Sequence, residues 1–143
     1  MPLIPWSSKF ELGIKEIDEQ HKKIMELINL SYDVFKNKKY KDQAELEKIL
    51  KEMGDYAVYH FGVEENYFKL YGYEKADSHT EVHNQYRAKF KEWRQEYLNN
   101  KDDENKTATL FFEISNFLQD WWIWHINNTD RDYIPFMKAN HIS

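Results

Sequence analysis

The histidines of this chain occur at spacings that suit metal binding. The sequence has 6 histidines, and five of them fall on apolar stripes of segments that we expect to be helical: His21, His60, His79, His83 and His125. The sixth, His141, lies in the C-terminal tail. His79 and His83 are four residues apart, as are His60 and Glu64, and such pairs share one helix face with Cβ atoms about 6 Å apart. Cysteine is absent, so a metal here would have nitrogen and oxygen ligands.

Two carboxylates are candidates to complete this ligand set. Glu64 lies on an apolar stripe, where a buried carboxylate is costly unless a charge such as a metal ion compensates it. The alternative is that Glu64 lies at the edge of the stripe and reaches water, as we expect of Glu65. Asp130 follows His125 by five residues, which is roughly 140° from its face in a regular helix, so it turns inward only if the helix frays or bends. Asp132 fits by angle but lies about 10.5 Å further along the axis, and spacing leaves both aspartates open.

Five imidazoles and two carboxylates are more ligands than one metal ion needs. Two ions bridged by the carboxylates would account for all of them. Ligands of these types suit iron, but also zinc, copper or manganese. The spacing therefore predicts a dinuclear site without naming its metal.

Four amphipathic segments position these residues. Apolar residues recur at helical spacing over about 16–35, 43–71, 77–98 and from 107 to the Asn127–Asn128 pair. The breaks between them are short and polar, at 36–42, around Gly72 and at 99–106. Helices joined in this way predict an all-α fold, an antiparallel up-down-up-down four-helix bundle, and we expect an N-terminal extended arm before it.

This topology brings the histidines to one pole of the bundle. His21 lies near the start of the first helix and His60 toward the end of the second. The pair His79 and His83 opens the third helix, and His125 closes the fourth. These four helix ends meet at one pole, so the five imidazoles converge at one level. Packing of an apolar core does not favour five histidines at one level of the bundle, whereas a metal site requires them there.

Composition narrows the class of protein. The chain has 143 residues, which predicts a single domain spanning residues 1–143. Its net charge of -5 disfavours nucleic-acid binding, and no apolar run approaches the roughly 20 residues of a membrane helix. The stretch Met1–Trp6 lacks the features of a signal peptide, so we expect a cytoplasmic location.

The sequence resembles the hemerythrin family, especially its bacterial single-domain members, over nearly the whole chain. The matching motifs are Trp6, Leu12-Gly13-Ile14, Ile17-Asp18-Glu19-Gln20-His21, His60-Phe61-Gly62-Val63-Glu64-Glu65, His79-Thr80-Glu81-Val82-His83, Asp120-Trp121, His125-Ile126, Asp130 and Tyr133. They occur in the family's order and spacing, which makes the resemblance specific. It also favours Asp130 over Asp132 as the second acid.

The resemblance implies a non-heme di-iron centre that binds dioxygen reversibly, for transport, storage or local supply. His79, His83 and His125 would bind one iron. His21 and His60 would bind the other and leave one position open for dioxygen. Glu64 and Asp130 would bridge the two irons together with an oxo or hydroxo group. The implied protein is not an enzyme, and its partners are dioxygen and an unidentified protein recipient of dioxygen.

One position departs from the family pattern. The residue three before the last histidine ligand is often leucine in the family, near bound dioxygen, and here it is Trp122 beside Trp121. We expect these two tryptophans to line the dioxygen pocket, where Trp122 would slow dioxygen exchange and autoxidation. The alternative is that Trp122 packs between helices.

Other functions fit the same ligands. An oxidase, a peroxidase or a nitric oxide reductase would use the site catalytically, and a sensor would use it to report oxygen or iron. A metal-free interaction bundle would leave Glu64 and the five histidines on the stripes unexplained.

Overall fold

The computed structural model describes residues 3–39 and 41–143. Residue 40, in the first predicted break, and residues 1–2 lie outside these ranges. Four long helices form the molecule: α1 (Lys15–Lys36), α2 (Gln43–Tyr71), α3 (Ala76–Asn100) and α4 (Glu104–Trp124). Within the described residues there is no strand. The prediction of an all-α fold is therefore confirmed.

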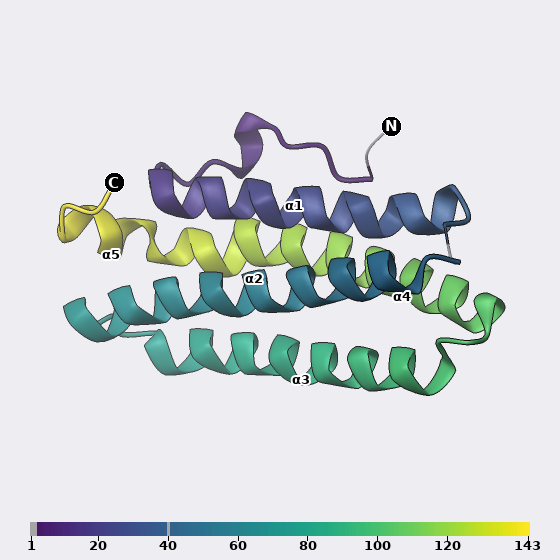
Figure 1. Cartoon of the computed structure of the whole chain (residues 1–143). Coiled ribbons are helices and arrows are strands. Elements are labelled where there is room, and N and C mark those ends of the chain that lie inside the picture. The colour runs from purple at the N-terminus through teal and green to yellow at the C-terminus, as the bar shows by residue number, and fades with distance from the viewer. Residues whose placement is uncertain (1–2, 40) are drawn as a thin grey trace.

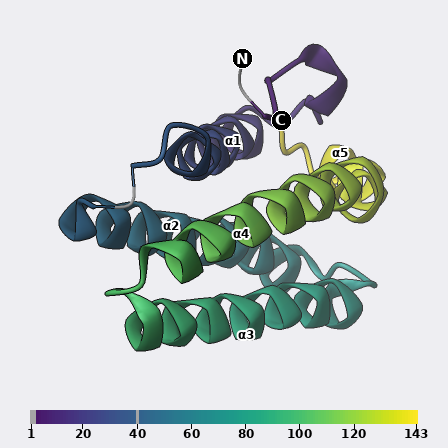
Figure 2. The same ribbon diagram turned by 90° about the vertical axis from the view of Figure 1, so that its right-hand side faces the viewer.

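The helices run antiparallel to their neighbours, as Figure 1 shows. Helix α1 packs against α2 and α4, and α3 packs against the same two helices, so the four axes form the corners of a bundle (Figure 2). Buried apolar side chains from all four helices fill the space between them. This is the up-down-up-down arrangement that the short connections predicted.

Local sequence accounts for the helix ends. Asp42 and Asp103 precede α2 and α4, and their side chains accept hydrogen bonds from the backbone N–H groups of Glu45 and Lys106, each at 3.1 Å. Such caps satisfy donors that the first helical turn leaves unpaired. The cap at Asp103 also explains why α4 begins at Glu104 and not near residue 107 as predicted. Helix α2 ends at Gly72, whose φ of 72° is in the left-handed region that favours glycine.

The N-terminal arm lies along α1 (Figure 1) and contains a short turn, η1 (Ser8–Phe10). Hydrogen bonds fix it at both ends. Asn29 exchanges hydrogen bonds of 2.8 and 3.1 Å with the backbone of Ile4. Asp18 accepts hydrogen bonds of 2.8 and 3.1 Å from the backbone of Leu12 and Gly13.

The C-terminal end of the fourth helix changes its winding. After α4 the chain forms a π-helical turn, η2 (His125–Asp130), then a 3-10 turn, η3 (Arg131–Tyr133), and a final short helix, α5 (Ile134–Ala139). The sequence predicted a regular helix as far as Asn127–Asn128. Asn and Thr are weak formers of α-helix, and the side chain of Asn128 donates a 3.0 Å hydrogen bond to the carbonyl of Trp124, where the winding changes.

No helix in the described ranges combines the length and apolar character needed to cross a membrane.

Candidate metal centre

The structure brings all seven predicted ligands together at one end of the bundle. They come from α1, α2 and α3 and from η2, the π-helical turn that continues α4: His21, His60, Glu64, His79, His83, His125 and Asp130. Each is at most 3% exposed. The remaining histidine, His141, is exposed and lies outside this cluster.

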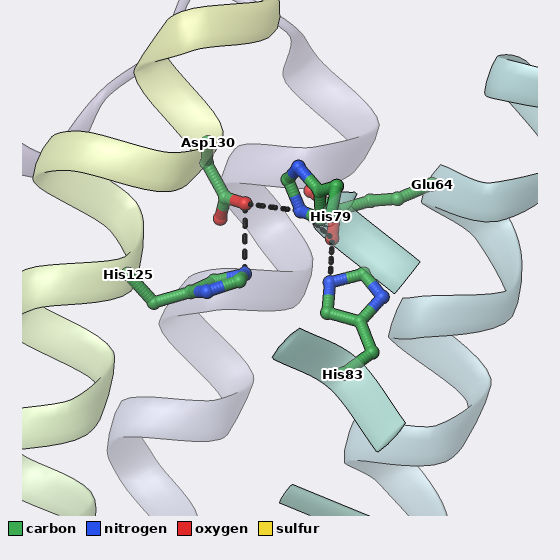
Figure 3. A group of neighbouring side chains, drawn as sticks. All are labelled: Glu64, His79, His83, His125 and Asp130. Carbon is green, nitrogen blue, oxygen red and sulfur yellow. Dashed lines mark ion pairs between the residues drawn. The ribbon is translucent and has the colours of Figure 1, made fainter. Parts of the chain in front are cut away.

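Five of these residues form a first group, shown in Figure 3: Glu64, His79, His83, His125 and Asp130. One ligand atom from each lies within 4.8 Å of the others. Asp130 Oδ1 is 3.1 Å from Nε2 of His79 and 2.9 Å from Nε2 of His125. Glu64 Oε1 is 3.3 Å from Nε2 of His83. Three imidazoles and two carboxylates thus point at one small volume.

A second group shares both carboxylates and adds two histidines from α1 and α2. It consists of His21, His60, Glu64 and Asp130, again with ligand atoms within 4.8 Å of one another. His21 Nε2 lies 3.1 Å from Nε2 of His60 and 3.1 Å from Asp130 Oδ2. His60 Nε2 lies 3.4 Å from Glu64 Oε1. The two groups are adjacent, because Glu64 and Asp130 belong to both. The second group has one protein ligand fewer than the first.

The π turn explains how Asp130 reaches the cluster. In an α-helix it would point away from the face of His125, but a π turn bonds residue i to residue i+5 and brings the two near the same face. Asp130 is fully buried. Asp132, the alternative acid, has a side chain that is 58% exposed and lies 3.6 Å from Nζ of Lys75. It takes no part in the cluster.

The cluster favours ionised acids throughout and neutral imidazoles at His60 and His125. Burial lowers the pKa of His83, but its contacts with Glu64 and Glu65 outweigh burial and raise it. Burial and the charge of Asp130 push the pKa of Glu64 upward, but interactions with His60 and His83 outweigh them and lower it to about 2. Burial also raises the pKa of Asp130, yet interactions with its histidine neighbours, above all His125, hold it well below its usual range. Burial lowers the pKa of His60 to about 3 and also lowers that of His125. Anionic carboxylates and unprotonated imidazoles are the forms that bind metal.

The inner atoms of the cluster lack hydrogen-bond partners. Buried atoms without such a partner include Nε2 of His79, His83 and His125, Oε1 of Glu64 and both carboxylate oxygens of Asp130. Some of them are close to one another, but they are not aligned as hydrogen bonds. Buried polar atoms are normally satisfied, because each unpaired one is destabilising. Metal ions at these positions would satisfy them together, and a buried set of imidazoles and carboxylates without thiolates fits iron.

Two further residues orient the imidazoles, and the sequence analysis missed both. Gln20 Oε1 accepts a 2.6 Å hydrogen bond from Nδ1 of His60. Glu65 Oε2 accepts a 2.8 Å hydrogen bond from Nδ1 of His83, and Arg87 lies 2.8 Å from the same oxygen. Because the acceptors are oxygens, each Nδ1 carries the proton and each Nε2 is left free for a metal.

The expectation that Glu65 reaches water holds only for part of its side chain. Its side chain is only 24% exposed and joins α2 to α3. Burial raises the pKa of Glu65, but its hydrogen bonds to His83 and Arg87 outweigh burial and lower it. A sequence signal did exist, since Gln20 and Glu65 are adjacent in the chain to His21 and Glu64.

Tyr133 closes the cluster from the C-terminal side. It is fully buried, and its hydroxyl donates a hydrogen bond to Oε2 of Glu64. The first group uses the other oxygen, Oε1. The phenol therefore fixes the orientation of the carboxylate without occupying the atom that faces the histidines.

The two tryptophans lie side by side against the cluster, with ring centroids 4.9 Å apart, and both are near His125. Trp122 is fully buried, with its ring centroid 5.9 Å from that of His21 and 5.8 Å from that of His60, and it stacks on Phe61 at 5.7 Å. It thus borders the two-histidine group and also packs between helices, so its packing role is confirmed and its place beside bound dioxygen stays a prediction. Trp121 stacks on His125 at 4.3 Å, against the three-histidine group.

Together these observations define an all-α bundle with two adjacent groups of buried imidazoles and carboxylates, each of which could hold a metal ion through nitrogen and oxygen. A family model for the hemerythrin HHE cation binding domain matches residues 12–137. The chain belongs to the hemerythrin family.

Relatives and solved structures agree with this assignment. A bacteriohemerythrin of Clostridium acetobutylicum is 34% identical over 130 residues, which cover 90% of this chain and 97% of the relative. A bacteriohemerythrin of Pseudomonas paraeruginosa is 29% identical, with coverage of 96% and 84%. The crystal structure of a hemerythrin point mutant matches with a TM-score of 0.78 and 25% identity, over 94% of this chain and 97% of that one.

Proposed function

We propose that this chain holds two irons at the cluster and binds dioxygen reversibly there. The observation that carries the proposal is the pair of adjacent ligand groups that share Glu64 and Asp130. His79, His83 and His125 would hold one iron, and His21 and His60 the other. The two carboxylates would bridge them, together with an oxo or hydroxo group. A site for a single metal ion would not need seven buried ligands arranged in two groups that share two carboxylates.

The inequality of the two groups supports dioxygen binding at one iron. One group offers five protein ligands and the other four, so the two-histidine side has the free position. When bound, the irons would supply the electrons that hold dioxygen. The residues of the chain exclude water from that side, because Trp122 and Phe61 are both fully buried beside it. They also fix the imidazoles, through Gln20 and Glu65.

The test is the visible spectrum of the anaerobically reduced, iron-loaded protein before dioxygen is added, after it is added, and after it is purged. We expect an absorption band that appears with dioxygen, persists, and disappears on purging. The variant Glu64→Gln, which removes a shared ligand charge, serves as the control and should show no such band. A band that never forms in the unmodified chain, or that decays at once while a substrate is oxidised, would contradict reversible binding and favour the enzyme.

We propose further that the chain acts without catalysis, as one domain in the cytoplasm, and delivers dioxygen to a protein recipient. Support comes from the similarity to bacteriohemerythrins, of which the matched residues cover 97% and 84%. A steady-state turnover of dioxygen in the presence of a reductant would be evidence against a carrier.

A further inference from the structure

A groove between α2 and α3 is lined by none of the seven predicted metal ligands, and the proposed function does not use it. It has a volume of about 330 Å³, and we call it the α2–α3 groove. Small-molecule sites in proteins typically occupy roughly 300–1,000 Å³. The groove is therefore large enough for a small ligand but too small for a folded partner.

The groove has an apolar base and two apolar sides. Tyr86 and Phe90 of α3 are buried at its base. Val58 of α2 and Leu98 of α3 also line it, and they are 48% and 54% exposed. Gly54 allows α2 to approach the base closely, since a Cβ there would lie 2.8 Å from the ring of Phe90. A hydrocarbon chain lying in the groove would cover apolar surface that water now reaches.

The same groove carries an excess of positive charge, although the chain has a net charge of -5. Arg87, Lys91 and Arg94 line it from α3, and their spacings of four and three residues place them on one helix face. Asp55 is an acid of the groove wall, and its carboxylate is already 2.8 Å from Nζ of Lys51.

The three cations are not equally free to bind a ligand. Arg87 is engaged, because its guanidinium lies 2.8 Å from Oε2 of Glu65 and 2.8 Å from Oδ1 of Asn84. The side chains of Lys91 and Arg94 have no ion pair or hydrogen bond with any other residue in the part of the chain that the structure describes. Two unpaired cations thus lie beside an apolar trough.

We propose that the α2–α3 groove binds a small amphiphilic carboxylate, such as a medium-chain fatty acid. Its hydrocarbon chain would lie on Phe90, Val58 and Leu98, and its carboxylate between Lys91 and Arg94. Apolar contact and charge-assisted hydrogen bonds are both needed for this class of ligand, and the groove offers both within one volume. None of the seven predicted metal ligands lines the groove.

The first test compares two probes of equal chain length and opposite charge. Octanoate and octylammonium are titrated by calorimetry into the iron-loaded full chain at low ionic strength. We expect octanoate to bind at one site and octylammonium not to bind. Absence of octanoate binding, or equal binding of the two probes, would overturn the proposal without any variant being made.

The second test locates the site. The charge reversals Lys91→Glu and Arg94→Glu, made together, should weaken octanoate binding by about tenfold or more, because both ligand-facing cations are lost. The matched control is Lys15→Glu with Lys138→Glu, which changes the net charge equally at exposed positions on α1 and α5. Far-UV circular dichroism establishes that both proteins are folded, and the milder pair Lys91→Gln and Arg94→Gln replaces the first if it is not. Equal weakening in the control would place octanoate elsewhere and reject the groove.

Discussion

At the scale of single residues, the imidazoles of the cluster are held by unequal partners. His83 donates to Glu65, a carboxylate that also pairs with Arg87, whereas His60 donates to Gln20, a neutral amide. A charged acceptor makes the imidazole a stronger donor to a metal than a neutral one does. The three-histidine group should therefore be the tighter of the two metal positions.

Removing the acceptor of His83 should weaken metal binding. In Glu65→Leu we expect affinity for cobalt(II) at the three-histidine group to fall by roughly 10–100-fold, the usual effect of losing a residue that orients a ligand. Titration of the metal-free protein against a competing chelator measures this, and the cobalt absorption bands report the geometry. The control is Glu81→Leu, at an exposed position on the same helix as His83. Equal affinities in the two variants would show that Glu65 has no such role.

Trp122 supports a second prediction at this scale. Its ring is buried against His21 and His60, on the side where dioxygen is proposed to bind. We expect Trp122→Leu to exchange dioxygen and to autoxidise faster than the unmodified chain, because a smaller side chain opens the approach to that side. Stopped-flow absorption measures both rates.

The control for Trp122 is Trp124→Leu, since Trp124 is 66% exposed two residues further along. Removing a large buried side chain also destabilises a core, by about 3–5 kcal/mol for truncation to alanine, so rates are compared below the onset of unfolding. Identical rates in Trp122→Leu and the unmodified chain would mean that Trp122 serves packing alone.

The sequence predicted the residues of the cluster but not the residues that orient them. Five histidines and Glu64 stand out because each interrupts an apolar stripe, and that pattern is local to one helix. Gln20 and Glu65 contact histidines 40 and 18 residues away in sequence. Such contacts depend on how neighbouring helices are rotated about their axes, which the period of one helix does not specify.

At the scale of elements, the π turn η2 is the feature that sequence periodicity could not supply. The α-helical period of 3.6 residues places Asp130 outside the cluster, and only the wider winding between His125 and Asp130 brings it in. The weak helix formers Asn127, Asn128 and Thr129 permit the helix to fray or bend there, but they do not specify which irregular form it takes. The bounds of α2, by contrast, agree with the predicted range of about 43–71, and the local sequence accounts for them through Asp42 and Gly72.

Two glycines, Gly62 inside α2 and Gly72 just after its last residue, give opposite predictions for the same substitution. Gly62→Ala should stabilise the protein by about 0.5–1 kcal/mol, because Gly62 lies inside the helix with nothing near its Cβ position. Gly72→Ala should destabilise it by about 1 kcal/mol, because Gly72 has a φ of 72°, which strains any residue with a Cβ.

Urea unfolding of both variants, with the same metal content, measures the two effects. Each variant serves as the control for the other, since the added methyl group is identical and both positions are free of contacts within 4 Å. Changes of the same sign would contradict the account of how α2 ends at Gly72.

At the scale of the whole molecule, the cluster of seven ligand side chains lowers the stability of the fold when no metal is bound. Five histidines and two carboxylates are buried at one end of the bundle, in a volume where apolar side chains would otherwise pack. Their unpaired inner atoms destabilise the metal-free chain. The aromatic and aliphatic core along the rest of the bundle must offset this, and it includes Trp93, Tyr97 and Phe111.

Metal loading should therefore stabilise the chain by mass action. A ligand present at a thousand times its dissociation constant adds about 4 kcal/mol to the free energy of unfolding, which for a domain of this size raises Tm by roughly 10 °C. Differential scanning calorimetry of the iron-loaded protein, and of the same preparation after reduction and chelation, measures the difference. In Glu64→Gln the carboxylate shared by both groups has lost its charge, so the iron-dependent part of Tm should largely disappear while the metal-free Tm stays the same or rises. If iron leaves Tm unchanged in the unmodified chain, the cluster is not a metal centre, and both the assignment of its ligands and the dioxygen site built on them fail together.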